Sequence, residues 1–259
     1  MGASPRSQVH VGVTTAPLGD PQRAFALLRS IGARGAQLSA TQPGMRPREL
    51  GPSARRDLSA SLARNELVAS GIDAWIPPSH FTDPAHAERA IEAVAAACAL
   101  ASELGRVPVT VELPAPASDG SPEVARRSEA IAAIAACAER FGTRIADAGG
   151  AAGAPWPPIG ASVDTAGALA QGLDPAAEVS RAGGRAVSVR VSDLSRTGMR
   201  EPPGSAGGRL DLLALRVAVQ VAGVPGLPVI DARQWPEPHD AVARAVAAWA
   251  SSLPAAPIH

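Results

Sequence analysis

The sequence predicts a (β/α)8 barrel that forms one domain over residues 1–259. Eight short segments along the chain have the composition of strands, two of them with clear alternation of apolar and polar or small residues, and a helix or helix-sized segment follows each of them. The connections between them are short, and 259 residues is a common length for one such barrel. Strand and helix units that alternate in this way form a parallel sheet, and eight of them can close into a barrel.

The strand pattern is clearest in residues 186–193, where valine at 187, 189 and 191 alternates with serine, arginine and serine. A period of two residues is typical of a strand that has one apolar and one polar face. The first strand, 9–15, has the same pattern. The eight expected strands cover residues 9–15, 35–41, 66–77, 107–113, 143–147, 159–164, 186–193 and 227–231.

The expected helices carry recognisable start signals, such as Asp20-Pro21 and Ser121-Pro122, which place an N-cap residue before a proline at the first helical position. In the longest helix, 83–105, the apolar residues recur at steps of three and four. The helices are expected at 20–33, 53–65, 83–105, 121–142, 174–182, 210–222 and 239–253, with longer loops at 42–48, 149–158 and 196–208.

An open doubly wound sheet is the alternative that also uses alternating strands and helices. Such sheets usually carry a glycine-rich turn for a dinucleotide after the first strand. The residues at that place, 13–17, read Val-Thr-Thr-Ala-Pro and cannot cradle a pyrophosphate. The barrel is therefore the favoured fold.

The balance of charge points to a small-molecule partner. The 24 basic and 24 acidic residues cancel, which argues against nucleic acid and against an anionic membrane surface. Every basic residue is an arginine, and the chain has no lysine and no tyrosine, so Schiff-base chemistry and a tyrosine acid are excluded.

The chain carries no signal that predicts export or membrane insertion. Its N-terminus lacks the apolar run of a signal peptide, and the longest apolar run, 93–101, is about half of what spans a bilayer. The two cysteines, Cys98 and Cys137, lie on apolar helix faces and are expected to be free, buried thiols. We expect a cytoplasmic protein; an oligomer is compatible with the sequence.

If the valine faces of the strands pack under the helices, the polar faces line the lumen, and the functional groups gather at the C-terminal ends of the strands. Arg190 would then point into the lumen and require carboxylates, an anion or water. Each acid at a strand end has the alternative role of capping the next helix. Four acids are expected at the same mouth, namely Glu112, Asp147, Asp164 and Asp231.

Several motifs, in this order, resemble the sugar phosphate isomerase/epimerase superfamily, the xylose isomerase-like barrels. The segments that carry the resemblance are 57–58, 73–78, 79–81, 83–86, 162–167, 172–175, 189–193, Arg200 and 203–211. The family is typified by a divalent metal bound by a Glu after strand five, an Asp after strand six, a His on strand seven and a Glu after strand eight. The resemblance implies that the metal polarises a hydroxy-ketone while carboxylates move a proton through an enediol.

Transferred by this resemblance, the metal ligands would be Asp147, Asp164 and Asp231, if a metal (Mn, Mg, Co or Zn) is retained. Arg190 stands in the place of the histidine, and a guanidinium has no lone pair for a metal and repels a cation. No cofactor is therefore the first expectation. Arg190 is expected to bridge Asp164 and Asp231 or to hold an anionic substrate.

The resulting hypothesis is an isomerase or epimerase that acts on a small carbohydrate or related hydroxy-carbonyl compound. The alternative is a non-catalytic binding or regulatory barrel; a DNA-repair relative suits this neutral, histidine-poor chain less. The residues expected in the site are Glu112, Asp231 and His80 for catalysis, and Arg190, Trp75, Asp193 and Arg200 for substrate binding.

Overall fold

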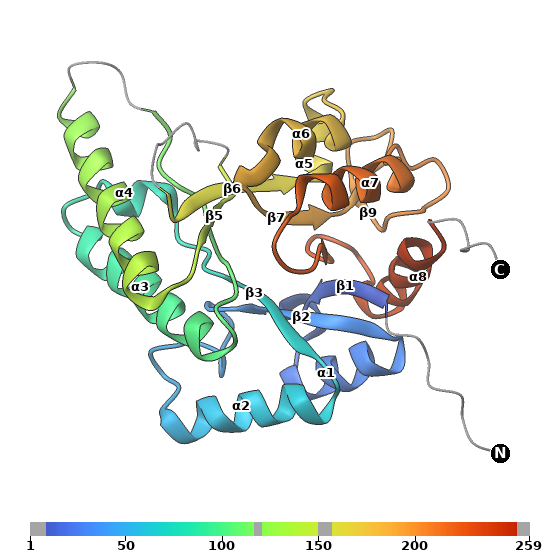
Figure 1. Ribbon diagram of the computed structural model, residues 1–259, viewed down its shortest axis with the longest axis horizontal. Helices are drawn as coiled ribbons and strands as arrows, with labels where there is room; N and C mark the ends of the chain where they lie inside the picture. The colour runs from blue at the N-terminus through green and yellow to red at the C-terminus, as the bar shows by residue number, and fades with distance from the viewer. Residues whose placement is uncertain (1–8, 117–120, 150–156, 253–259) are drawn as a thin grey trace.

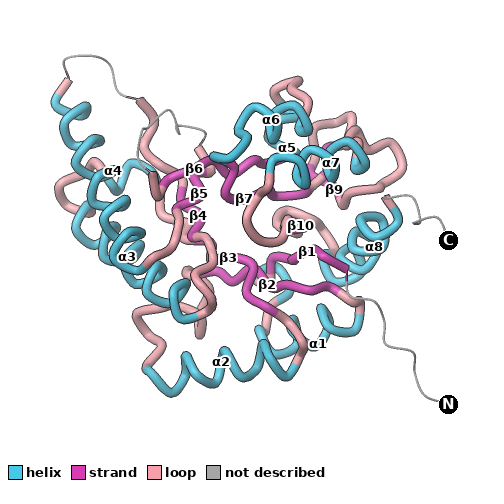
Figure 2. Tube along the Cα trace, in the orientation of Figure 1, coloured by secondary structure: helices cyan, strands magenta, loops and turns pink. Residues whose placement is uncertain are grey.

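The structure is a computed structural model that describes residues 9–116, 121–149 and 157–252. Eight parallel strands close into a barrel in the order β1-β10-β7-β6-β5-β4-β3-β2, and helices surround it (Figures 1 and 2). The predicted (β/α)8 barrel is confirmed. The barrel strands are β1 (Val9–Thr14), β2 (Ala33–Ser39), β3 (Val68–Asp73), β4 (Val109–Val111), β5 (Ile145–Asp147), β6 (Ile159–Asp164), β7 (Ala186–Val191) and β10 (Val229–Ile230).

The helices follow the strands, as the sequence predicts, and several begin at the expected caps. The carboxylate of Asp20, for example, accepts from the amide of Arg23 at 3.0 Å. The α-helices are α1 (Pro21–Ser30), α2 (Pro52–Arg64), α3 (Ala87–Glu103), α4 (Pro122–Phe141), α5 (Thr165–Ala170), α6 (Pro175–Ala182), α7 (Leu212–Ala222) and α8 (Pro238–Ser251), and the 3-10 helices are η1 (Ala16–Leu18), η2 (Pro78–Phe81) and η3 (Gly183–Arg185).

Helix α3 begins four residues later than the predicted start at 83. The carboxylate of Asp83 accepts from the amide of Ala85 at 2.9 Å and contacts Nδ1 of His86 at 2.6 Å. These contacts stabilise a turn, which competes with the helix for the same residues.

Two elements near the barrel mouth are absent from the prediction. Helix α5 follows β6 directly, because Asp164 caps it by accepting from the amide of Gly167 at 3.2 Å. A two-stranded hairpin, β8 (Asp193–Leu194) with β9 (Arg200–Glu201), forms where the end of the seventh strand and the loop after it were expected. Strands of two residues are too short to show an alternation. Most of the predicted loop 149–158 lies outside the described residues.

The apolar faces of the strands turn toward the helices. Val11 and Val13 of β1 and Val189 of β7 belong to the same buried hydrophobic cluster as Phe25 and Leu28 of α1. The expectation that valine faces outward and polar side chains face the lumen is confirmed for these strands. Among the described residues, no helix has the length and apolar character needed to cross a bilayer.

Candidate functional site

An ion pair crosses the lumen near the C-terminal ends of the strands. Nη2 of Arg190, on β7, donates to Oδ2 of Asp73, at the end of β3, at 2.8 Å. Three strands separate β3 from β7 on either side of the ring, so the two residues come from opposite walls. The side chains are 1% and 4% exposed. A buried guanidinium is thus held across the barrel.

The other oxygen of Asp73 is bound by β2. Nε2 of Gln37 donates to Oδ1 of Asp73 at 2.6 Å and lies 3.5 Å from the hydroxyl of Thr110 on β4. Both contacts come from residues that alternate with apolar neighbours, as the strand period requires. The polar face of the barrel therefore forms a connected layer beneath the mouth.

Asp231 follows β10 directly and is fully buried, and three arginines surround it. Nε of Arg233 donates to Oδ1 at 2.7 Å, and Nη2 of Arg233 pairs with Oδ2. Nε of Arg190 and Nη1 of Arg200 each lie 3.6 Å from Oδ2. Burial favours the neutral acid, but the hydrogen bond from Arg233 and the three positive charges outweigh it and lower the pKa of Asp231. Asp231 is therefore a carboxylate at neutral pH.

Arg200 reaches the mouth from the hairpin that follows β7. Its Nη2 pairs with Oδ2 of Asp164, at the end of β6, so one guanidinium lies between Asp164 and Asp231. Arg190 was expected either to form this bridge or to hold an anionic substrate. It lies 3.6 Å from Asp231, but among the described residues Arg200, and not Arg190, pairs with Asp164. The register places Arg190 beside Asp164 on neighbouring strands, but its side chain extends across the lumen to Asp73 instead.

The ring of Trp75 lies against two of these arginines. The guanidinium carbon of Arg190 is 4.9 Å from the ring centroid, and that of Arg233 is 4.1 Å from it. Distances of this size allow a cation–π interaction. Burial favours loss of the proton from Arg233, yet the hydrogen bond and charge of Asp231, with the charges of Asp73 and Asp164, raise its pKa.

We call this set the mouth cluster: three arginines and three aspartates whose formal charges cancel. Its members are Arg190, Arg200, Arg233, Asp73, Asp164 and Asp231. Nε and Nη1 of Arg190 and Nη1 of Arg200 are buried and have no hydrogen-bond partner. A buried N–H without an acceptor costs about 1–3 kcal/mol, so these donors are poised to bind an oxygen atom.

Two of the predicted metal-binding or catalytic acids are not members of the mouth cluster. Oδ1 of Asp147 accepts from the amides of Leu113 at 3.1 Å and Gly149 at 2.9 Å, so this carboxylate connects the ends of β4 and β5. Glu112 is exposed just beyond β4 and makes no ion pair among the described residues. Within the part of the chain that the structure describes, no three His, Cys, Asp or Glu side chains are grouped so that they could hold a metal ion.

Asp193 is buried and binds a loop. Its Oδ1 accepts from the amides of Leu194, Arg209 and Leu210 at 2.7, 2.7 and 3.0 Å. A Cβ on Gly208 would lie 2.1 Å from the other oxygen, so only glycine lets the loop backbone approach this closely. Asp193 thereby fixes the path of the chain from β9 to α7.

His80 lies in η2 with its ring stacked on that of His86, at 4.5 Å between centroids and 13° between planes. His80 and Trp75 line one shallow cavity, which adjoins the wall of the mouth. The structure thus places these two residues beside the same cavity.

Asp73 and Arg233 are the members of the mouth cluster that sequence reasoning missed. The third strand was predicted to extend to residue 77, which placed Asp73 in its interior and gave no reason to single it out. Arg233 follows Asp231 by two residues, a spacing that brings both side chains to the same side of an extended segment. That spacing could have predicted that Arg233 lies beside Asp231 in the mouth cluster.

Comparison with known proteins agrees with the architecture. Residues 25–146 match the family of xylose isomerase-like TIM barrels. No curated protein matches the sequence.

Solved structures with the same fold include sugar-processing enzymes. A 3-keto-D-glucoside 4-epimerase from E. coli has 14% identity and a TM-score of 0.71, over 93% of this chain and 98% of that one. A sugar phosphate isomerase/epimerase from Parabacteroides distasonis has 14% identity and a TM-score of 0.69, over 96% and 97%. An L-ribulose 3-epimerase has 17% identity and a TM-score of 0.69, over 93% of each chain. The family match over residues 25–146 and the closed eight-stranded barrel show that the chain has the fold of the xylose isomerase-like TIM barrels.

Proposed function

We propose that the protein is an isomerase or epimerase of a small carbohydrate or related hydroxy-carbonyl compound, in which guanidinium groups take the place of the family's divalent metal. The observation that carries the proposal is Arg190. It is 1% exposed, it stands where the resemblance expects a histidine ligand, and two of its N–H groups lack an acceptor.

The residues of the mouth cluster do not fit a divalent cation. Asp164 and Asp231 already pair with arginines, and Arg190 offers no lone pair. A divalent ion a few ångströms from Arg190 would be repelled by several kcal/mol even at an effective dielectric constant of about 20. The resemblance therefore supplies the reaction class, and the arginines supply the positive charge.

The free donors suit an oxygen on which negative charge develops. When a base removes the proton from the hydroxyl-bearing carbon beside a carbonyl, the electrons of the C–H bond form a carbon–carbon double bond, and the π electrons of the carbonyl move to its oxygen and give an enediolate. Nε and Nη1 of Arg190 and Nη1 of Arg200 would stabilise this oxygen by hydrogen bonds in a buried site. Return of the proton to the same or the neighbouring carbon completes an epimerisation or an isomerisation.

Glu112 and Asp231 are the proposed proton-transfer groups. Glu112 is exposed and forms no ion pair with the residues that the structure describes, which suits it to the role of the base. Asp231 is a weaker base, because its pKa is lowered by the surrounding arginines despite its burial. Trp75, whose ring lies against Arg190 and Arg233, would flank the substrate, and His80 would support Trp75 from the cavity on its other side. Asp193 would act by holding the loop that follows the hairpin.

A binding or regulatory barrel is the second candidate. All three aspartates of the mouth cluster are paired with arginines, and the Arg190–Asp73 pair crosses the lumen. Such internal neutralisation is what a barrel would show if it had kept the fold of an isomerase and lost its reaction. For either candidate we propose a small-molecule partner and a cytoplasmic setting.

Hydrogen exchange distinguishes the two candidates. Purified protein is incubated in D2O with a panel of aldoses, ketoses and their phosphates, and loss of the proton beside the carbonyl is followed by NMR. The isomerase proposal expects exchange that Glu112→Gln abolishes and that Glu123→Gln, an exposed change on α4, leaves intact. Absence of exchange over the panel, with saturable binding that Arg200→Ala weakens, would favour the binding barrel.

Metal analysis tests the substitution of guanidinium for metal separately. Protein purified without chelator is expected to contain no stoichiometric manganese, cobalt or zinc. One equivalent of any of these, lost together with exchange activity on chelation, would overturn the role given to Arg190.

A further inference from the structure

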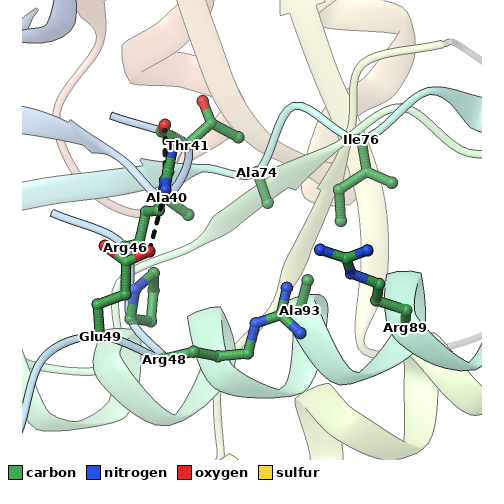
Figure 3. Close-up of a pocket in the computed structure, with 10 residues that line it drawn as sticks. Ala40, Thr41, Arg46, Arg48, Glu49, Ala74, Ile76, Arg89 and Ala93 are labelled. Carbon is green, nitrogen blue, oxygen red and sulfur yellow. Dashed lines mark hydrogen bonds and ion pairs between the residues drawn. The ribbon is translucent and has the colours of Figure 1, made fainter. Parts of the chain in front are cut away.

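We propose that a pocket behind Trp75, outside the lumen, binds the phosphate group of a small phosphate monoester. The inference stands apart from the chemistry proposed for the mouth cluster, because the two sites share no charged residue. Its basis is the convergence of two arginines, Arg48 and Arg89, on one cavity (Figure 3).

The pocket has a volume of about 400 Å³ and lies where β2 and β3 end against α3. Its floor is apolar and is formed by Ala74, Ile76 and Ala93. Ala74 and Ile76 alternate with Asp73 and Trp75 along the chain, so they face away from the lumen. A cavity of this size is within the range of small-molecule sites.

The two guanidinium groups enter this pocket from different elements. Figure 3 shows Arg48 extending from the loop after β2 and Arg89 rising from α3, both into the space below Ile76. Arg89 has no hydrogen bond or ion pair to the described residues, and Arg48 has only a 3.8 Å contact with Glu92, an exposed side chain. Two like charges that share a cavity favour an anion between them.

The acids nearby do not supply this anion. Glu49 pairs with Arg46 at 3.0 Å on the loop side of the pocket. Glu92 contacts one face of Arg48 and is itself 61% exposed. Asp83 is engaged by the amide of Ala85 and by His86. Arg89 and most of the donors of Arg48 stay available for a ligand.

A second cavity continues the pocket and favours a ligand larger than phosphate alone. It has a volume of about 420 Å³, shares Arg48, Ile76 and Arg89 with the first, and extends to Trp75 and the stacked rings of His80 and His86. Flat aromatic faces next to an anion site are suited to a sugar or another small organic body. Phosphate, with more acceptor oxygens and charge than a carboxylate, fits two guanidinium groups best.

Calorimetric titration with inorganic phosphate tests the inference. We expect saturable binding at one site, weakened roughly tenfold or more in Arg48→Ala/Arg89→Ala, because each lost guanidinium removes charge-assisted hydrogen bonds. The matched control is Arg56→Ala/Arg64→Ala, which removes two exposed arginines from α2 and should bind as the wild type does. Arg200→Ala, in the mouth cluster, should also retain phosphate binding.

The proposal is overturned by absence of phosphate binding in the wild type, by equal weakening in both double variants, or by loss of binding in Arg200→Ala alone. Acetate serves as the carboxylate probe, and an affinity equal to that of phosphate would refute the choice of phosphate. Glucose 6-phosphate is expected to bind more tightly than inorganic phosphate, whereas glucose should not bind here; the reverse order would refute a monoester. A failure at this pocket leaves the exchange test of the mouth cluster unaffected.

Discussion

Arg190 and Asp73 lie 117 residues apart in sequence and form a 2.8 Å hydrogen-bonded ion pair through the centre of the barrel. The pair joins strands that are never neighbours in the sheet, so it links the two halves of the ring directly. It also decides where the remaining charges lie. With Arg190 turned toward Asp73 and Asp231, the place between Asp164 and Asp231 is taken by Arg200 from the hairpin.

Replacing Arg190 should destabilise the protein strongly. Arg190→Leu leaves the buried carboxylates of Asp73 and Asp231 with fewer positive partners, and breaking a buried pair in this way costs about 3–5 kcal/mol. Urea unfolding measured by circular dichroism gives the change in the free energy of unfolding. Arg29→Leu breaks the exposed pair with Glu66 and should cost less than about 1 kcal/mol. Equal losses in the two variants would contradict the role of the buried pair.

The sequence predicts the strands and their lumen-facing residues only where the alternation of apolar and polar residues is long enough. Residue alternation is sufficient for β7, because six residues with two unlike faces leave one orientation that buries the valines. The same reasoning places Arg190 in the lumen. It cannot predict the partner, since a guanidinium on a long side chain reaches acids on several strands.

Short or locally stabilised elements were harder to predict. Helix α5 has six residues and depends on the cap from Asp164, an acid to which the resemblance assigns the role of a metal ligand. The hairpin that carries Arg200 has two residues in each strand and depends on contacts with residues distant in sequence. Arg200 was named from a motif, but its position between two aspartates follows only from the folded loop.

The loop held by Asp193 should open when its acceptor is lost. Asp193→Ala removes three hydrogen bonds to backbone amides and leaves these amides unpaired, at a cost of about 1–3 kcal/mol. Opening of the loop should be detected as faster cleavage by trypsin after Arg209, which mass spectrometry can monitor. Asp57→Ala, an exposed change on α2, should leave the cleavage rate unaltered. If Arg209 is equally resistant in both variants, another contact holds the loop.

The two thiols should react slowly and in a fixed order. Burial raises the pKa of Cys98 to about 12, and burial also raises the pKa of the partly exposed Cys137, so neither thiol forms much of the reactive thiolate at neutral pH. With a chromogenic disulfide reagent, Cys137 should react first and Cys98 only on unfolding. Cys137→Ser and Cys98→Ser assign the two phases. Rapid reaction of Cys98 in the native state would contradict its burial.

Acid should weaken the folded state through Asp231. Because its pKa is lower in the folded protein than in the unfolded chain, this carboxylate contributes stability that is complete above its unfolded pKa of about 3.9 and is lost as the pH falls through the folded value. The free energy of unfolding of the wild type should therefore fall more steeply below about pH 4 than that of Asp231→Asn. If the free energy of unfolding of Asp231→Asn fell more steeply than that of the wild type, the pKa of Asp231 would not be lowered by folding, and the prediction would be refuted.

Arg233 should be the main group that keeps Asp231 ionised. Burial favours the neutral acid, and the hydrogen bond from Arg233 is the largest of the effects that oppose it. In Arg233→Gln that bond loses its charge, while Arg190 and Arg200 remain 3.6 Å away, so the pKa of Asp231 should rise. Carbon-13 NMR of the labelled aspartate carboxyls follows the titration directly, and Asp231→Asn identifies the signal. Arg181→Gln breaks an exposed pair with Glu178 on α6 and should leave the Asp231 signal unchanged. If the pKa of Asp231 does not change in Arg233→Gln, Arg190 and Arg200 are sufficient to keep this carboxyl ionised. Asp231 would then remain a weak base whichever residue occupies position 233.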